Sequence, residues 1–133
     1  MSNKIAKDVA EQQFAKLCES RRIETDVTTF SERQKLLFAD RKADIINLMM
    51  SGALVLNEQC DPVYTPPVKG AAPLTFYRVT GAILMEGDNI TGSVARLLAV
   101  ATALTKSTPG DLSKLEAPDF RAVDDITAFL IGQ

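Results

Sequence analysis

The side chains that most often carry out chemistry are scarce in this 133-residue chain, which contains no histidine and two cysteines. Without histidine, the chain lacks the commonest general base and the commonest ligand of transition metals. Cys18 lies on the apolar stripe of an expected helix and Cys60 lies in an expected turn, and no histidine is present to activate either thiol. We therefore expect both cysteines to stay reduced, Cys18 to fill the core, and the protein to be no enzyme, with no catalytic residue.

One glycine-bearing segment imitates a phosphate-binding loop. Gly87 and Gly92 have the Gly-x-x-x-x-Gly spacing and precede an expected helix. Ser93 follows Gly92 directly, where a phosphate-binding loop needs a lysine to neutralise the phosphate charge. The segment is therefore expected to be a loop that enters a helix, and we expect no bound cofactor.

A group of acidic residues near the carboxyl end could suggest a metal or acid–base site: Asp111, Glu116, Asp119, Asp124 and Asp125. The adjacent Asp124 and Asp125 would point about 100° apart on a helix. Glu116 and Asp119 suit the positive amino terminus of a helix. We expect a solvated helix face here and no metal site.

Composition argues against nucleic-acid and membrane partners. The net charge of −2 lacks the basic surface that binds nucleic acid. Arg21 and Arg22 stand beside Glu19 and Glu24, which favours exposed ion pairs over phosphate contacts. No apolar window approaches the roughly 18 residues that span a bilayer, and the polar amino terminus does not resemble a secretory signal. We expect synthesis in the cytosol.

The element that most clearly needs a partner is a helix expected over about residues 89–105. Its apolar stripe consists of Ile90, Val94, Leu97, Leu98, Ala101 and Leu104. Its opposite side is mostly alanine, at Ala95, Ala99 and Ala103. Such a helix is either buried on every side or presents its small residues to another subunit. The alanine face therefore predicts self-association.

The other elements follow from apolar spacing and turn residues. Helices are expected over about residues 4–20 and 31–50, the second between a Ser31–Gln34 capping box and Gly52. A small hairpin is expected from 53–56 and 62–65, and a strand over 74–79. Residues 80–88 fit either a strand or a helical turn. A further helix is expected over about 109–115, with Thr108 as its cap and Asp111 three residues after the cap, and another over about 118–130.

These elements predict a mainly α protein with a small antiparallel β element: two N-terminal helices, a short hairpin and strands, and a C-terminal helical bundle. Three prolines and a glycine in residues 66–73 predict a linker. We expect an N-terminal segment over 1–65 and a C-terminal domain over 74–133.

The carboxyl half resembles a known family. Residues 96–105 (Arg-Leu-Leu-Ala-Val-Ala-Thr-Ala-Leu-Thr) are followed by Leu112 and Leu115, then Asp119-Phe120, then Phe129-Leu130. This order is similar to the helical pattern of phage tail assembly chaperones. The resemblance covers roughly residues 74–131, including the strand, and more loosely 52–66. The helices of residues 4–50 are a departure, because many family members lack them.

The resemblance implies a non-enzymatic protein in the cytoplasm of an infected bacterium. Such proteins coat the tape-measure protein until tail-tube subunits replace them. The candidate contact residues are apolar positions on the last helices: Leu97, Leu98, Leu104, Phe120, Ile126 and Phe129. Because apolar residues lie on several sides of those helices, serine at 126 and 129 is expected to abolish binding and leave the fold intact. The alternative is a structural component of the particle, a tail or connector protein, which would stay in the virion.

Overall fold

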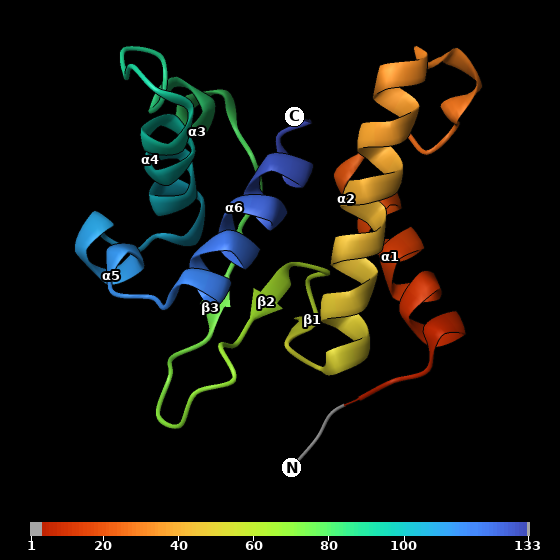
Figure 1. The fold of residues 1–133 in the computed structure, drawn as a ribbon, viewed down its shortest axis with the longest axis horizontal. Coiled ribbons are helices and arrows are strands. Elements are labelled where there is room, and N and C mark those ends of the chain that lie inside the picture. The colour runs from red at the N-terminus through yellow and green to blue at the C-terminus, as the bar shows by residue number, and fades with distance from the viewer. Residues whose placement is uncertain (1–3, 133) are drawn as a thin grey trace. The chain divides into compact units, whose positions relative to one another are not determined.

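A computed structural model describes residues 4–132 of the chain (Figure 1). The chain divides into two compact units, with the boundary between Pro73 and Leu74. We call residues 1–73 unit 1 and residues 74–133 unit 2. The proline-rich segment 66–73, predicted as a linker, falls within unit 1.

Unit 1 is built on two helices, α1 (Lys7–Arg21) and α2 (Glu32–Ser51), joined by a 3-10 turn at Val27–Thr29. The two helices pack side by side and run in opposite directions (Figure 1). Their contact buries Ala10, Phe14, Leu17 and Cys18 from α1 and Ile45, Ile46 and Met49 from α2. Phe38 extends this core, with its ring edge-on to Phe14 at 6.3 Å and to Phe30 at 5.9 Å.

The ends of α2 lie where the sequence predicts them. Ser31 Oγ accepts a hydrogen bond from Gln34 N (3.2 Å), and Ser31 N donates to Gln34 Oε1 (2.8 Å), which completes the capping box. Gly52 ends the helix with a φ of 85°, a left-handed conformation that side chains disfavour. Local sequence therefore determines both ends of α2.

A short hairpin completes unit 1. Strand β1 (Leu54–Leu56) pairs antiparallel with β2 (Pro62–Tyr64), with Val55 opposite Val63. The hairpin is tied to α1 by an ion pair, because Arg21 Nη2 donates to Asp61 Oδ1 at 3.0 Å. Both side chains are almost fully buried, at 4 % and 10 % exposure. The prediction that Arg21 forms an exposed ion pair with a nearby glutamate is therefore wrong. Its guanidinium is buried and pairs with a residue 40 positions away in the chain.

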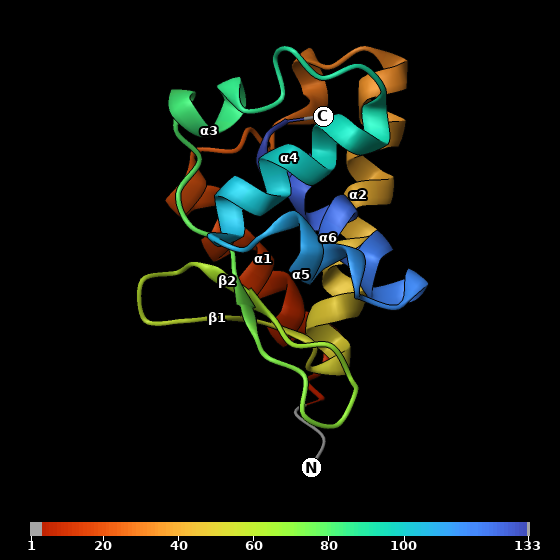
Figure 2. The ribbon, with the colours of Figure 1, turned by 90° about the vertical axis from the view of Figure 1, so that its left-hand side faces the viewer.

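Unit 2 begins with a two-residue strand and is otherwise helical: β3 (Leu74–Thr75), α3 (Gly81–Met85), α4 (Ser93–Thr105), α5 (Pro109–Ser113) and α6 (Ala117–Leu130). Helices α4 and α6 pack against each other, as Figure 2 shows, and α5 packs against α4. Its buried side chains include Phe76, Val100, Leu104, Leu112, Val123, Ile126 and Phe129. The Thr108–Asp111 capping box that opens α5 is present as the sequence indicates.

Two element boundaries in unit 2 differ from the sequence-based prediction. The strand expected over 74–79 stops at Thr75, because Tyr77 N donates to Leu104 O at the end of α4 (3.0 Å). The helix expected from residue 89 starts only at Ser93, because Gly92 has a φ of 96°, outside the helical region. Residues 80–88 include a helix, α3, whose cap is Thr80.

The observed architecture is mainly α with a small antiparallel β element, which confirms the predicted fold class. Among the described residues, no helix combines the length and the apolar character needed to cross a bilayer.

Candidate partner-binding pocket

The six predicted contact residues divide into two groups. Leu97, Leu98 and Phe120 are half-buried. Leu104, Ile126 and Phe129 lie in the core, at 0 %, 1 % and 5 % exposure. A surface made from all six is therefore not presented by this fold, and the buried three serve packing.

The reason lies in how α6 is surrounded. Its residues 126–130 are all buried, so apolar positions that fall off its main stripe still face protein. A helix that is apolar on several sides is buried on several sides. Serine at positions 126 and 129 would place hydroxyl groups in the core, which costs free energy. The packing therefore does not support the prediction that this change leaves the fold intact.

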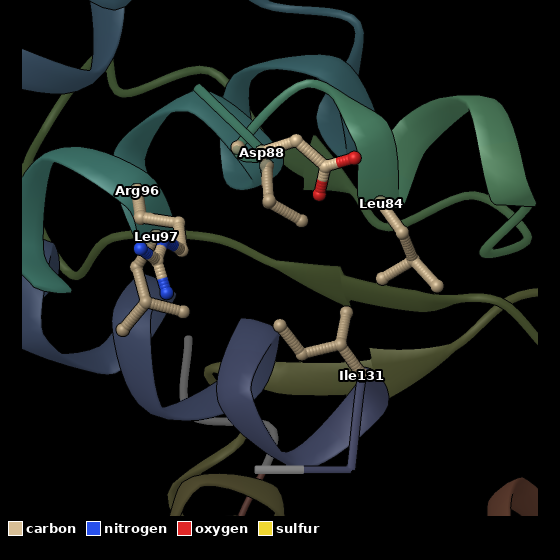
Figure 3. Close-up of a pocket in the computed structure, with 7 residues that line it drawn as sticks. Leu84, Asp88, Arg96, Leu97 and Ile131 are labelled. Atoms are coloured by element: carbon tan, nitrogen blue, oxygen red, sulfur yellow. The ribbon is translucent and has the colours of Figure 1, made fainter. Parts of the chain in front are cut away.

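Unit 2 has a pocket on its surface, at a site that shares one residue with the six predicted contacts. A pocket of about 310 Å³ is lined by Leu84, Gly87, Asp88, Arg96, Leu97, Val100 and Ile131. Figure 3 shows Leu84, Leu97 and Ile131 around this space, each from a different part of the fold. Leu84 comes from α3, Leu97 from α4, and Ile131 from the carboxyl cap of α6. Only Leu97 belongs to the residues predicted from sequence.

Gly87 allows the turn after α3 to approach α4 closely. A Cβ atom at this position would lie 2.6 Å from Arg96 Cγ and 3.3 Å from Val100 Cγ2. Real Cβ atoms do not approach another atom to 2.6 Å, so a larger residue would force the Arg96 side chain, which lines the pocket, to move. The shape of the pocket thus depends on glycine at residue 87.

Two opposite charges line the pocket. Asp88 follows Gly87 in the turn, and Arg96 stands on the second turn of α4. Arg96 Nη2 donates to Ile90 O at 3.4 Å, which links the loop to the helix. Among the described residues, Asp88 and Arg96 form no ion pair with each other. Both charges are therefore available to a bound partner.

Exposed apolar side chains lie on α3 and α4, two of the helices that contribute residues to the pocket. Leu84 is 44 % exposed, and its neighbour Met85 is 67 % exposed. Val94, one turn before Leu97, is 61 % exposed. Of these three, Leu84 lines the pocket, and exposed apolar side chains are a common feature of surfaces that bind other proteins.

The sequence contained two signals for this pocket. Gly87 was interpreted only as half of a phosphate-loop imitation, although a glycine beside a helix can also mark close backbone approach. Arg96 stood out as the only charge on the apolar helix. Ile131 carried no such signal, because its position depends on how α6 ends against α4.

The other side chains that could take part in chemistry lie outside the pocket. Burial raises the pKa of the Cys18 thiol to about 11, with a smaller opposing effect from Lys42, so the thiol is protonated at neutral pH. Asp119 is buried at 5 % exposure, which corrects its assignment to a solvated face. Among the described residues, no group of three or more acidic or cysteine side chains is placed to hold a metal ion.

No protein-family model matches the chain, and no curated protein or solved structure matches it either.

Proposed function

We propose that this protein is a non-enzymatic phage tail assembly chaperone that binds the tape-measure protein in the cytoplasm of the infected bacterium. The observation that supports the proposal is the pocket of unit 2, with apolar walls at Leu84, Leu97 and Ile131 and two charges that do not pair with each other. A tape-measure protein is a long helical chain with repeated apolar faces, which aggregates when those faces stay exposed.

The pocket suits one apolar side chain of an amphipathic helix. A volume of about 310 Å³ accommodates a single large side chain from the partner rather than a whole helix face. Asp88 and Arg96 would pair with charges that flank that side chain on the partner helix. Because the two charges have opposite sign, they also favour one direction of the bound helix.

A small contact of this kind fits a chaperone that must later be displaced. A single pocket gives modest affinity, so each bound copy can dissociate on its own. Tail-tube subunits can then replace the copies one at a time. The resemblance of residues 74–131 to tail assembly chaperones includes α4 and α6, from which Leu97 and Ile131 reach the pocket.

The direct experiment is co-expression of this protein with the longest open reading frame encoded beside it. We expect the long chain to become soluble and to carry many copies of this protein, as measured by affinity capture and light scattering. A long chain that stays insoluble, or that remains uncomplexed, would contradict the proposal.

A pair of matched variants tests whether the pocket is the contact. Leu84→Asp places a charge at the mouth of the pocket, on a side chain that is already 44 % exposed, and should abolish solubilisation. Val68→Asp makes the same chemical change at a 47 % exposed position in unit 1 and should leave solubilisation intact. If both variants solubilise the long chain equally well, the pocket is not the contact site.

The virion distinguishes this function from the alternative of a structural tail or connector protein. A chaperone should be missing from purified particles, as judged by mass spectrometry. A fixed copy number in the particle would establish the structural role instead.

A further inference from the structure

The outward face of α2 carries apolar side chains that the α1–α2 contact does not cover. Leu36 is 69 % exposed and Leu37 is 43 % exposed, whereas Ile45, Ile46 and Met49 are buried. At about 100° per residue, the exposed pair lies on the side of the helix opposite the buried three. Unit 1 therefore has a second apolar surface that its own core does not use.

Charged residues flank the two leucines along the same face. At helical spacing, Arg33 lies one turn before Leu36 and Leu37, and Asp40 lies one turn after them. Both charged residues are exposed. Among the described residues, neither Arg33 nor Asp40 forms an ion pair, although Glu32 and Lys35 of the same helix pair with each other at 3.4 Å. We call Arg33, Leu36, Leu37 and Asp40 the α2 face.

The α2 face is complementary to itself. Arg33 and Asp40 are spaced equally on either side of the midpoint between Leu36 and Leu37, each about 5 Å along the axis at 1.5 Å per residue. An antiparallel copy of the helix that is centred on this midpoint brings leucine against leucine. The same rotation brings each arginine opposite an aspartate, twice in the pair.

We propose that a second copy of this chain docks on the α2 face, with the two α2 helices antiparallel about a two-fold axis between Leu36 and Leu37. Arg33 pairs with the partner's Asp40, and Asp40 pairs with the partner's Arg33. Such an isologous interface is the commonest arrangement of homodimers. This inference concerns unit 1 and does not rest on the proposed function of the pocket in unit 2.

The area of the contact predicts a reversible dimer. A helix of 20 residues is about 30 Å long, and one helix pair buries less than the roughly 1,600 Å² of a standard interface. Association should therefore depend on protein concentration. It should also weaken at high salt, since the flanking pairs lie at the exposed edge of the contact.

Charge reversal gives a test that does not disturb the fold, because both residues are exposed. In Arg33→Asp, two aspartates face each other at both ends of the contact, and in Asp40→Arg, two arginines do. We expect each variant alone to dimerise at least about tenfold more weakly than the native chain in sedimentation equilibrium. The double variant Arg33→Asp/Asp40→Arg should regain native association.

The decisive measurement mixes the two single variants. Each acidic face then meets a basic face, so the two proteins should bind each other although neither binds itself. Arg121→Asp and Glu58→Arg make the same changes at exposed positions elsewhere and should leave the association constant unchanged. A native chain that is monomeric at every concentration, or single variants that associate as the native chain does, would overturn the proposal. The second of these results would direct attention to the alanine face of α4.

Discussion

Each unit of this protein places an acidic and a basic side chain in a partly apolar setting, and the two units treat them differently. In unit 1, Arg21 and Asp61 meet at 3.0 Å and are both nearly inaccessible to solvent. In unit 2, Asp88 and Arg96 line the same pocket without pairing. The first pair is enclosed in the fold, where removal of one partner would leave a buried charge, whereas the second pair lines a pocket that is open to another molecule.

The largest effect is expected from breaking the buried pair of unit 1. Asp61→Ala leaves the Arg21 guanidinium buried without its carboxylate, which costs about 3–5 kcal/mol of stability. Glu32→Ala breaks the exposed Lys35–Glu32 pair and should cost less than about 1 kcal/mol. Urea unfolding measures both changes. Similar losses of stability in the two variants would show that the buried ion pair contributes no more than the exposed one.

Truncation to alanine should have a much larger effect on stability at the buried residues of α6 than at the exposed apolar residues of α3. Ile126→Ala removes a side chain that is 1 % exposed and should cost about 2–5 kcal/mol, with any loss of binding following from unfolding. Met85→Ala removes a side chain that is 67 % exposed and should change stability by less than about 0.5 kcal/mol. Thermal unfolding and partner binding, measured on the same samples, distinguish the two. A stable Ile126→Ala protein that fails to bind would restore Ile126 to the contact surface.

Glycine 87 should prove necessary for the shape of the pocket. Gly87→Ala forces Arg96 and Val100 apart from the turn, at a cost of about 1–3 kcal/mol for overpacking, and should weaken partner binding. Gly81→Ala is the control, because a Cβ there meets nothing within 4 Å and its backbone is helical. The control should be neutral or slightly stabilising. Equal melting temperatures for the two variants would argue against close approach at Gly87.

The smallest effect concerns a carboxylate on α6. Burial raises the pKa of Asp124 above its ordinary value of 3.8, and the charge of Asp125 adds to the shift. The folded protein therefore holds this proton more tightly than the unfolded chain, so stability falls as the pH rises through 3.8 and above. Asp124→Asn should stabilise the protein at neutral pH by less than about 1 kcal/mol, because the group is only half-buried. This gain should vanish below pH 3.8 in melting curves recorded across pH.

Local signals in the sequence predicted the parts of this fold that depend on neighbours in the chain. Ser31 with Gln34, and Thr108 with Asp111, identified helix starts that the structure contains. Gly52 identified a helix end for the same reason, since a cap is determined by a few consecutive residues.

Predictions that depended on distant residues were less successful. The partner of Arg21 lies 40 positions away, and the end of β3 depends on a hydrogen bond from Tyr77 to Leu104. Sequence spacing also could not distinguish an apolar residue that faces a partner from one that faces another helix. That is why the predicted contacts include Ile126 and Phe129, which are buried, and do not include Leu84 and Ile131, which line the pocket.

The Arg21–Asp61 pair also affects the order in which unit 1 matures during translation. At a synthesis rate of about 5–20 residues per second, the ribosome adds Asp61 about 2–8 s after Arg21. During that interval, burial of the Arg21 guanidinium would cost free energy, because its carboxylate partner has not yet been made. We therefore expect the last turn of α1 to reach its final packing only after the hairpin has been made.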